Sequence, residues 1–324
     1  MAGYSAGILQ LSIFCILALL FHKPSQEYSQ MMGWVYLEPA GWSPIAQYSL
    51  SFILIILQAF IFDFFISTKN IYEKSTGLPF LLYTLFFSIH PALIKLSPAL
   101  ISLSFILISI WMLINLYQQK KAMFASFNIG LLTTIATLFW FPAILFHIFN
   151  IIACAIIRPV SYKETIAFII GGLLPLLYLF AFQFAFNFQF DYQPQLIIEN
   201  PKAAFAQLRF SPAIWTYAGA LAVLMNIALF HYFRVYGRLK IISRRFFNVT
   251  ALIPLFLILG ALLAESPQGS HFAAFAIPFA TLLTQLLLDV KDERYIKIGF
   301  ILFFLIVTWL QIDWYLEISF SILK

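Results

Sequence analysis

The side chains best suited to chemistry in this sequence are a few charged residues that interrupt long apolar stretches. Glu27 and Glu38 lie between two such stretches, where a carboxylate can act as a general base toward an acceptor. The alternative for both is a solvated loop acid with no chemical role. Glu265 and His271 share the short segment AESPQGSHF, where a carboxylate and an imidazole can bind a phosphate-bearing or hydroxyl-bearing group or pass a proton. A hydrated turn explains the same segment equally well.

Arg209 is the cation best suited to grip a lipid phosphate, because a guanidinium binds phosphate oxygens in a bidentate manner. Its alternative role is simple anchoring at a membrane surface. The spacing of histidines and cysteines predicts no metal site, and no phosphate-binding loop or other cofactor motif is recognisable. We therefore expect no metal and no cofactor.

The densest group of charges is the stretch RVYGRLKIISRR. Its five basic residues are Arg234, Arg238, Lys240, Arg244 and Arg245. In a soluble protein such a cluster suggests nucleic-acid binding, but this chain is 62% hydrophobic and its mean hydropathy is +0.93. Between apolar segments, a basic cluster holds its loop in the cytoplasm. We expect a topology anchor here and no nucleic-acid partner.

The composition predicts an all-α, polytopic transmembrane helix bundle. A soluble domain of 324 residues needs a charged surface, which a chain with 10% charged residues cannot supply. The apolar runs are continuous, unlike the alternating strands of a membrane β-barrel. We expect one integral membrane domain, residues 1–324, with about eleven spans. They are placed near 7–21, 48–67, 78–94, 98–117, 124–140, 142–157, 165–187, 214–233, 248–264, 271–288 and 297–317.

Lysines and arginines alternate between the two sides of this predicted bundle. The loops after the even-numbered spans hold 14 of the 19, and the other side holds 5. The positive-inside rule then places the N-terminus in the cytoplasm and the C-terminus in the periplasm. Two long loops, about 22–47 and 189–213, lie outside, and all five candidates for chemistry fall on that outer side.

Part of the chain resembles membrane-embedded glycosyltransferases of the C superfamily (GT-C). The run from Leu78 to Phe146 is similar to their characteristic module of two spans, a basic inner loop, a glycine-leucine-rich helix and a short helix. The matching residues are Pro91, Lys120, Lys121, Gly130, Leu131, Leu132 and Pro142. The later stretch HFAAFAIPFATLLTQLLL resembles the late, proline-containing helix of that group, and its proline is Pro278. The resemblance implies a GT-C-like fold and sugar transfer from a polyprenyl-phosphate carrier at the outer face.

The sequence departs from that superfamily at two places. The superfamily usually has an aspartate early in the first outer loop, where this chain has only Glu27 and Glu38. His271 stands where an arginine often helps to hold the lipid-linked phosphate. A glutamate would then be the catalytic base and Arg209 the cation; alternatively, the fold is kept and catalysis has been lost.

Two further stretches, NIGLLTTIATLFWFPAILF and IIRPVSYKETIAFIIGGLLP, resemble an uncharacterised family of polytopic inner-membrane proteins from Bacteroidota. That resemblance implies a multi-pass protein of the bacterial inner (cytoplasmic) membrane.

Three functions are consistent with these observations. The first is lipid-linked glycosyl transfer in envelope glycan biogenesis, with Glu27 and Glu38 as catalytic candidates and Arg209, Glu265 and His271 as substrate contacts. The second is a non-catalytic membrane subunit of an envelope secretion, motility or export assembly. The third is a lipid or solute transporter. The expected partners are membrane lipids, a polyprenyl-phosphate-linked substrate and, for the second function, envelope proteins.

Overall fold

The computed structural model describes residues 4, 8–13, 43–74, 76–89, 91–119, 122–186, 212–263 and 269–290. All regular elements within these ranges are helices, as the composition predicts. Five of them are long and apolar enough to cross a membrane. These are Pro44–Thr68, Pro98–Asn115, Tyr162–Phe186, Ile241–Ala261 and His271–Asp289. The first and last predicted spans fall mostly or wholly outside the described residues, as do both long outer loops.

The α-helices are α2 (Pro44–Thr68), α3 (Leu78–Phe87), α4 (Pro91–Ile94), α5 (Pro98–Asn115), α6 (Met123–Phe139), α7 (Leu145–Ile157), α8 (Tyr162–Phe186), α10 (Pro212–Val235), α11 (Ile241–Leu263) and α12 (Ala276–Asp289). In the described part of the chain, 3₁₀ turns join or extend them: η3 (Leu116–Gln118), η4 (Phe141–Ile144), η5 (Tyr236–Arg238) and η6 (Gly269–Phe275).

Local sequence explains where several helices begin. Ser43 caps α2 by accepting a hydrogen bond from the Ala46 amide at 3.3 Å, and Ser97 caps α5 in the same way through Leu100 at 3.2 Å. A proline follows each cap, because its fixed φ suits the first helical turn and its missing N–H is not needed there. These short Ser-Pro pairs therefore mark where helices begin in a sequence that is otherwise continuously apolar.

Proline also divides the longest apolar stretch, as the sequence predicts. Helix α6 ends at Phe139, Trp140 is extended, and η4 begins at Phe141 with Pro142 in its first turn. Both Trp140 and Pro142 are buried, so the connection lies inside the bundle. The predicted span 78–94 is also divided, since α3 ends at Phe87 and the short α4 starts at Pro91.

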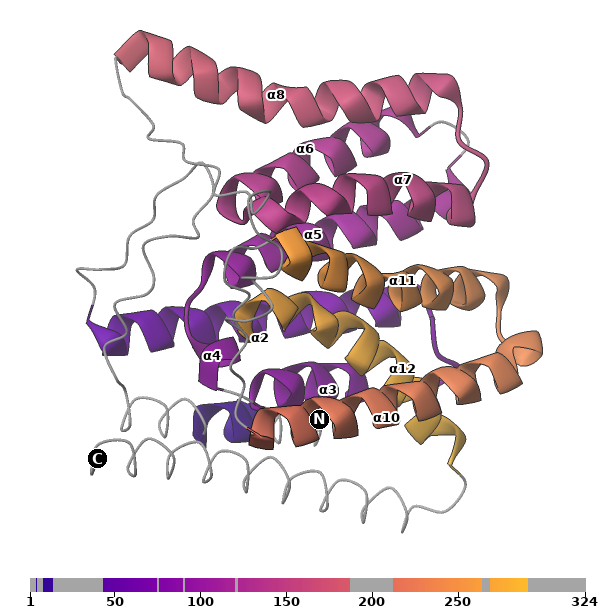
Figure 1. Ribbon diagram of the computed structural model, residues 1–324. Coiled ribbons are helices and arrows are strands. Elements are labelled where there is room, and N and C mark those ends of the chain that lie inside the picture. Colours follow the sequence, from indigo (N-terminus) through magenta and orange to yellow (C-terminus); the bar gives the residue numbers. More distant parts are fainter. Residues whose placement is uncertain are drawn as a thin grey trace.

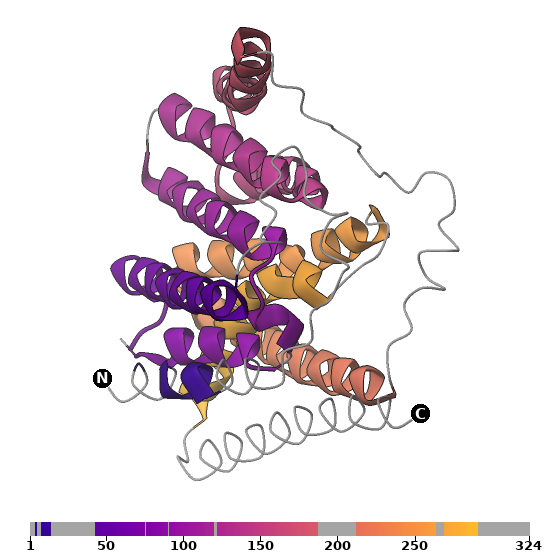
Figure 2. The same cartoon turned by 90° about the vertical axis from the view of Figure 1, so that its left-hand side faces the viewer.

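The helices lie side by side, with α8 along one edge against α6 and α10 toward the opposite edge (Figure 1, Figure 2). Helix α12 packs against α3, α10 and α11 and is the most enclosed of the long apolar segments. In an apolar 18-residue stretch of each segment, 72% of the residues within 271–289 are buried, whereas 22% of those within α8 are buried. The core therefore centres on α12, and α8 is peripheral.

Helix α8 is attached to α6 through glycines that allow the two backbones to approach closely. A Cβ atom on Gly171 would lie 2.0 Å from the carbonyl oxygen of Phe127, and one on Gly130 would lie 2.1 Å from that of Phe168. No side chain fits at either position. Small residues at a helix crossing are a common way to pack helices in membranes, where dispersion contacts replace the hydrophobic driving force.

Candidate functional site

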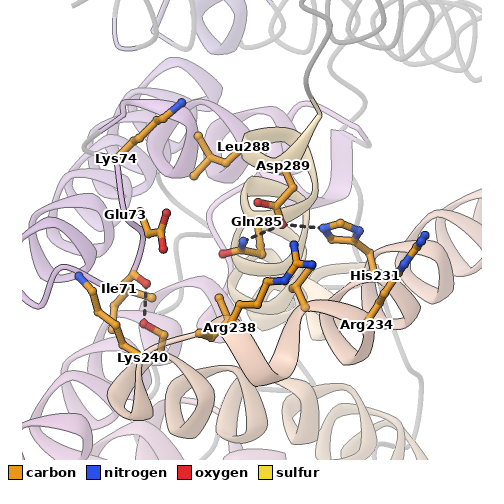
Figure 3. A pocket seen from close by; sticks show the side chains of 13 residues that line it. Ile71, Glu73, Lys74, His231, Arg234, Arg238, Lys240, Gln285, Leu288 and Asp289 are labelled. Carbon is orange, nitrogen blue, oxygen red and sulfur yellow. Dashed lines mark hydrogen bonds and ion pairs between the residues drawn. The ribbon is translucent and has the colours of Figure 1, made fainter.

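A cavity of about 660 Å³ opens at the end of the bundle where α2, α10 and α12 end and α11 begins (Figure 3). Its lining is rich in charged and polar side chains although the helices are apolar. The lining residues are Ile71, Glu73, Lys74, His231, Arg234, Val235, Arg238, Leu239, Lys240, Ser243, Gln285, Leu288 and Asp289. Three segments that are far apart in the sequence, 71–74, 231–243 and 285–289, therefore meet at one polar hollow.

The wall formed by the segment after α2 is fixed by its backbone. Asn70 has a φ of 47°, a left-handed conformation that asparagine tolerates and that ends the helix. The Ile71 amide then donates to the Ile66 carbonyl at 3.2 Å. The Ile71 carbonyl in turn accepts from the buried Ser243 hydroxyl of α11 at 2.6 Å, and the Tyr72 hydroxyl donates to the Thr281 carbonyl of α12 at 2.8 Å.

The turn between α10 and α11 is braced by Tyr232. This side chain is 1% exposed, and its hydroxyl donates to Asn248 Oδ1 at 2.7 Å. Helix α10 ends at Val235, η5 continues to Arg238, and α11 begins at Ile241. This tight connection turns the basic cluster around one end of the bundle.

The structure divides the five basic residues of this cluster into two groups. Arg234, Arg238 and Lys240 line the cavity. Arg244 and Arg245 instead lie over aromatic rings, Arg244 at 5.4 Å from the Tyr236 ring centroid and Arg245 at 4.8 Å from that of Tyr117. The latter pair makes cation–π contacts that hold the turn against its neighbours.

A second polar group closes one side of the cavity. Asp289 Oδ2 is 2.7 Å from His231 Nε2 and accepts a hydrogen bond from Gln285 Nε2 at 2.9 Å (Figure 3). These three residues connect α10 to α12 directly. Asp289 is therefore already engaged by two donors from within the protein.

Another ionic contact joins two further basic turns. Glu164 is 5% exposed and pairs with Arg158, and it accepts hydrogen bonds from the amides of Ser161 at 3.2 Å and Ala122 at 3.3 Å. Arg158 also donates to the Gln119 carbonyl. Glu164 thus caps α8 and ties the α5–α6 turn to the α7–α8 turn.

At the opposite end of the bundle, the structure describes one of the predicted site residues. His271 in η6 is 3% exposed, and its ring centroid lies 5.6 Å from that of Trp140. Element η6 packs against both α4 and α5, and the turn joining those two helices carries Lys95. Burial lowers the pKa of the Lys95 ammonium to about 8. Glu27, Glu38, Arg209 and Glu265 lie outside the described residues.

Sequence reasoning missed most of the cavity. It singled out Arg234, Arg238 and Lys240 mainly for topology, with an electrostatic attraction to anionic lipids of the inner leaflet as a secondary role, and it did not connect them with Glu73 or with Asp289. The sequence does show polar residues at the ends of the second, eighth and tenth predicted spans, and this pattern was the signal that could have indicated the cavity. Only packing shows that these ends converge.

One comparison with known proteins places the chain. A family model described as "Family of unknown function (DUF6427)" matches residues 43–319. The chain belongs to this family. The matched region contains every residue that lines the cavity, together with Arg209, Glu265 and His271, and it begins after Glu27 and Glu38. No curated protein and no solved structure matches the chain significantly.

Proposed function

We propose that this family member is a GT-C-like integral membrane enzyme of the bacterial inner membrane. It transfers a sugar from a polyprenyl-phosphate carrier at the outer face, with Glu27 or Glu38 as the base. The observation that best supports this proposal is the arrangement around η6. His271 is buried there beside Trp140, and the adjoining α4–α5 turn holds a half-buried lysine.

Lys95 adds to the cations already expected to contact the carrier phosphate. Its pKa is lowered because burial disfavours the ammonium ion. A phosphate bound nearby would favour the charged amine again, so ligand binding and protonation would be coupled. Perturbed ionisable groups of this kind are concentrated at functional sites.

The test is made in cells that lack the gene. We expect polyprenyl-phosphate-linked sugar to accumulate there and to return to its normal level with the wild-type protein. The double variant Glu27→Gln/Glu38→Gln and the variant Lys95→Gln should fail to restore it, whereas Lys163→Gln, at an exposed lysine in α8, should restore it. Unchanged pools of lipid-linked sugar in the deletion strain would overturn the proposal.

A second candidate, a non-catalytic subunit of an envelope assembly, is favoured by α8. This helix contacts α6 through its glycine face and leaves large side chains such as Leu177, Phe184 and Phe186 exposed by 61%, 89% and 68%. Lipid or a partner helix would cover them. A protein that purifies in mild detergent with a stoichiometric partner supports this candidate, and purification of the chain alone counts against it.

Transport has less support, because polar residues inside the bundle bind one another. Asn150 donates to Thr133 Oγ1 at 2.7 Å and to Ser109 Oγ at 3.2 Å, and Thr134 Oγ1 lies 2.9 Å from His147 Nε2. These groups bind one another between α5, α6 and α7. They fasten helices together in a setting where a buried polar group must find a partner.

A further inference from the structure

We propose that the cavity between α10, α11, α12 and the segment after α2 is a binding site for a phosphate-bearing anion. Arg234, Arg238 and Lys240 from the basic cluster and Lys74 from the opposite wall supply its positive charge. The ligand class is a phosphate ester, either the head group of an anionic lipid or a soluble molecule. This site is separate from the sugar-transfer site and does not depend on that proposal.

The lining of the cavity carries more positive than negative charge. Four basic side chains and two carboxylates surround the cavity. One carboxylate, Asp289, is already taken by His231 and Gln285. The other is Glu73, an exposed side chain. Positive charge therefore remains in excess within the cavity.

The cations that line the cavity have no partners among the residues that the structure describes. Within the described part of the chain, no hydrogen bond or ion pair involves the side chains of Lys74, Arg234, Arg238 or Lys240. Figure 3 shows Arg238 and Gln285 toward the middle of the opening, with Lys74, Lys240 and Arg234 around its edge. Cations that line one cavity repel each other, and a bound anion would offset that repulsion.

The walls of the cavity are held in place by hydrogen bonds within the protein, without a ligand. Buried hydrogen bonds from Ser243 to Ile71 and from Tyr72 to Thr281 lock the α2 segment onto α11 and α12. Tyr232 locks α10 onto α11. A preorganised site loses less conformational entropy on binding, so its charges contribute more fully to affinity.

A topology anchor alone does not account for this arrangement. The positive-inside effect requires basic residues on one side of the membrane and is indifferent to their direction. Arg245 meets that requirement while lying over the Tyr117 ring, away from the cavity. Arg234, Arg238 and Lys240 instead share one hollow with a lysine more than a hundred positions earlier. That convergence is what a ligand site needs.

The size and position of the cavity indicate the ligand. About 660 Å³ accommodates a head group or a small phosphate ester, since ligand pockets commonly measure about 300–1,000 Å³. The cavity lies where apolar helices end, which is the depth of lipid head groups. A guanidinium group can donate two parallel hydrogen bonds to the oxygens of one phosphate, so Arg234 and Arg238 suit such a ligand.

The experiment uses the purified full chain in nanodiscs and measures thermal stabilisation by two probes. One probe is pyrophosphate added to phosphatidylcholine nanodiscs. The other is phosphatidylglycerol included in the nanodisc itself. Stabilisation by pyrophosphate identifies a soluble phosphate compound as the ligand source, and stabilisation by phosphatidylglycerol alone identifies a lipid. Either result supports the proposal.

Three variants make the test specific. Arg234→Gln/Arg238→Gln should weaken binding of the effective probe by at least about tenfold, given the strength of hydrogen bonds to charged groups. Glu73→Gln removes the carboxylate left in the cavity and should strengthen binding several-fold, which damage to the fold cannot imitate. Arg245 belongs to the same cluster but lies outside the cavity, so the variant Arg245→Gln should bind the probe with the affinity of the wild type.

Three results would overturn the proposal. The first is that neither probe stabilises the wild-type protein more than it stabilises the double arginine variant. The second is that Arg245→Gln loses as much affinity for the probe as that variant does. The third is that Glu73→Gln binds the probe no more tightly than the wild type. The second of these would assign the effect to general surface charge.

Discussion

At the scale of single residues, charges that have the same role in the sequence have different roles in the structure. Arg158 and Arg238 both belong to predicted inner loops, and the positive-inside rule treats them alike. Arg158 is paired with buried Glu164, whereas Arg238 lines a cavity without a partner among the described residues. Their effects on stability should therefore differ.

Glu164→Ala should lower the free energy of unfolding by about 3 kcal/mol, because it leaves the Arg158 guanidinium and two backbone amides without their acceptor. Thermal unfolding in detergent measures the loss. The double variant Glu164→Ala/Arg158→Ala should lose less than the sum of the two single variants, since both remove the same contact. Strict additivity would show that the pair does not interact.

Among the lysines that the structure describes, Lys95 should be the most reactive at mildly alkaline pH. Its pKa is lowered to about 8 by burial, so about half of its amine is neutral at that pH, whereas an ordinary lysine with a pKa of about 10.4 is almost fully charged. Labelling with an amine-reactive reagent, read residue by residue by mass spectrometry, should rise for Lys95 as pH increases through 8 and then level off. A profile that still climbs above pH 10 would contradict this, and exposed Lys163 in the same sample is the internal reference.

At the scale of elements, the glycines of α6 and α8 decide how the peripheral helix is attached. Gly130 and Gly171 allow backbone contact that no other residue permits, because a Cβ would overlap a carbonyl oxygen of the facing helix. The remainder of α8 is largely exposed. Among the described elements, α8 is therefore held in place mainly by its contact with α6.

Gly171→Ala should destabilise the protein by about 2 kcal/mol or more, because the added methyl group forces α6 and α8 apart. Gly219→Ala in α10 is the matched control. A Cβ there meets no atom within 4 Å, so alanine should be neutral or slightly stabilising in the helix. Equal melting temperatures for the two variants would show that the α6–α8 crossing is not this close.

At the scale of the whole molecule, the turns that carry the basic residues gather at one end of the bundle. The ends of α2, α10 and α12 and the start of α11 share the cavity, and Arg245 of α11 lies over Tyr117 in η3 after α5. In Figure 1 these helix ends point toward the right, and η6 lies at the other end. The alternation of charge along the sequence thus corresponds to a separation in space.

The orientation of this bundle is testable with single cysteines. In a background of Cys15→Ser/Cys154→Ser, the variant Lys163→Cys at an exposed position should react with a membrane-impermeant maleimide only after the membrane is opened. A cysteine at Gln195, in the second predicted outer loop, should react in intact spheroplasts. The reverse pattern would invert the predicted topology and place the cavity at the outer face.

Much of the helical architecture follows from sequence because its causes are local. The apolar composition excludes a soluble surface, Ser43 and Ser97 with their following prolines begin helices, and Pro142 ends a stretch too long for one span. Each of these effects acts within a few residues along the chain. Among the described residues the helix positions are accordingly close to those predicted, except that α11 begins at Ile241 and not near residue 248, so Arg244 and Arg245 lie in its first turns.

The candidate site depends on contacts between residues distant in the sequence, and there sequence patterns have little to offer. Whether Arg238 meets Tyr117, Glu73 or lipid depends on which helices pack together, and that is set by close contacts such as Gly171 against Phe127 and hydrogen bonds such as Ser243 to Ile71. By itself the sequence determined the apolar, all-helical class of the protein, and it predicted that the positive charge gathers on one side of the membrane. Only the tertiary structure decided that part of this charge encloses a cavity, because helix packing fixes the direction in which each side chain points.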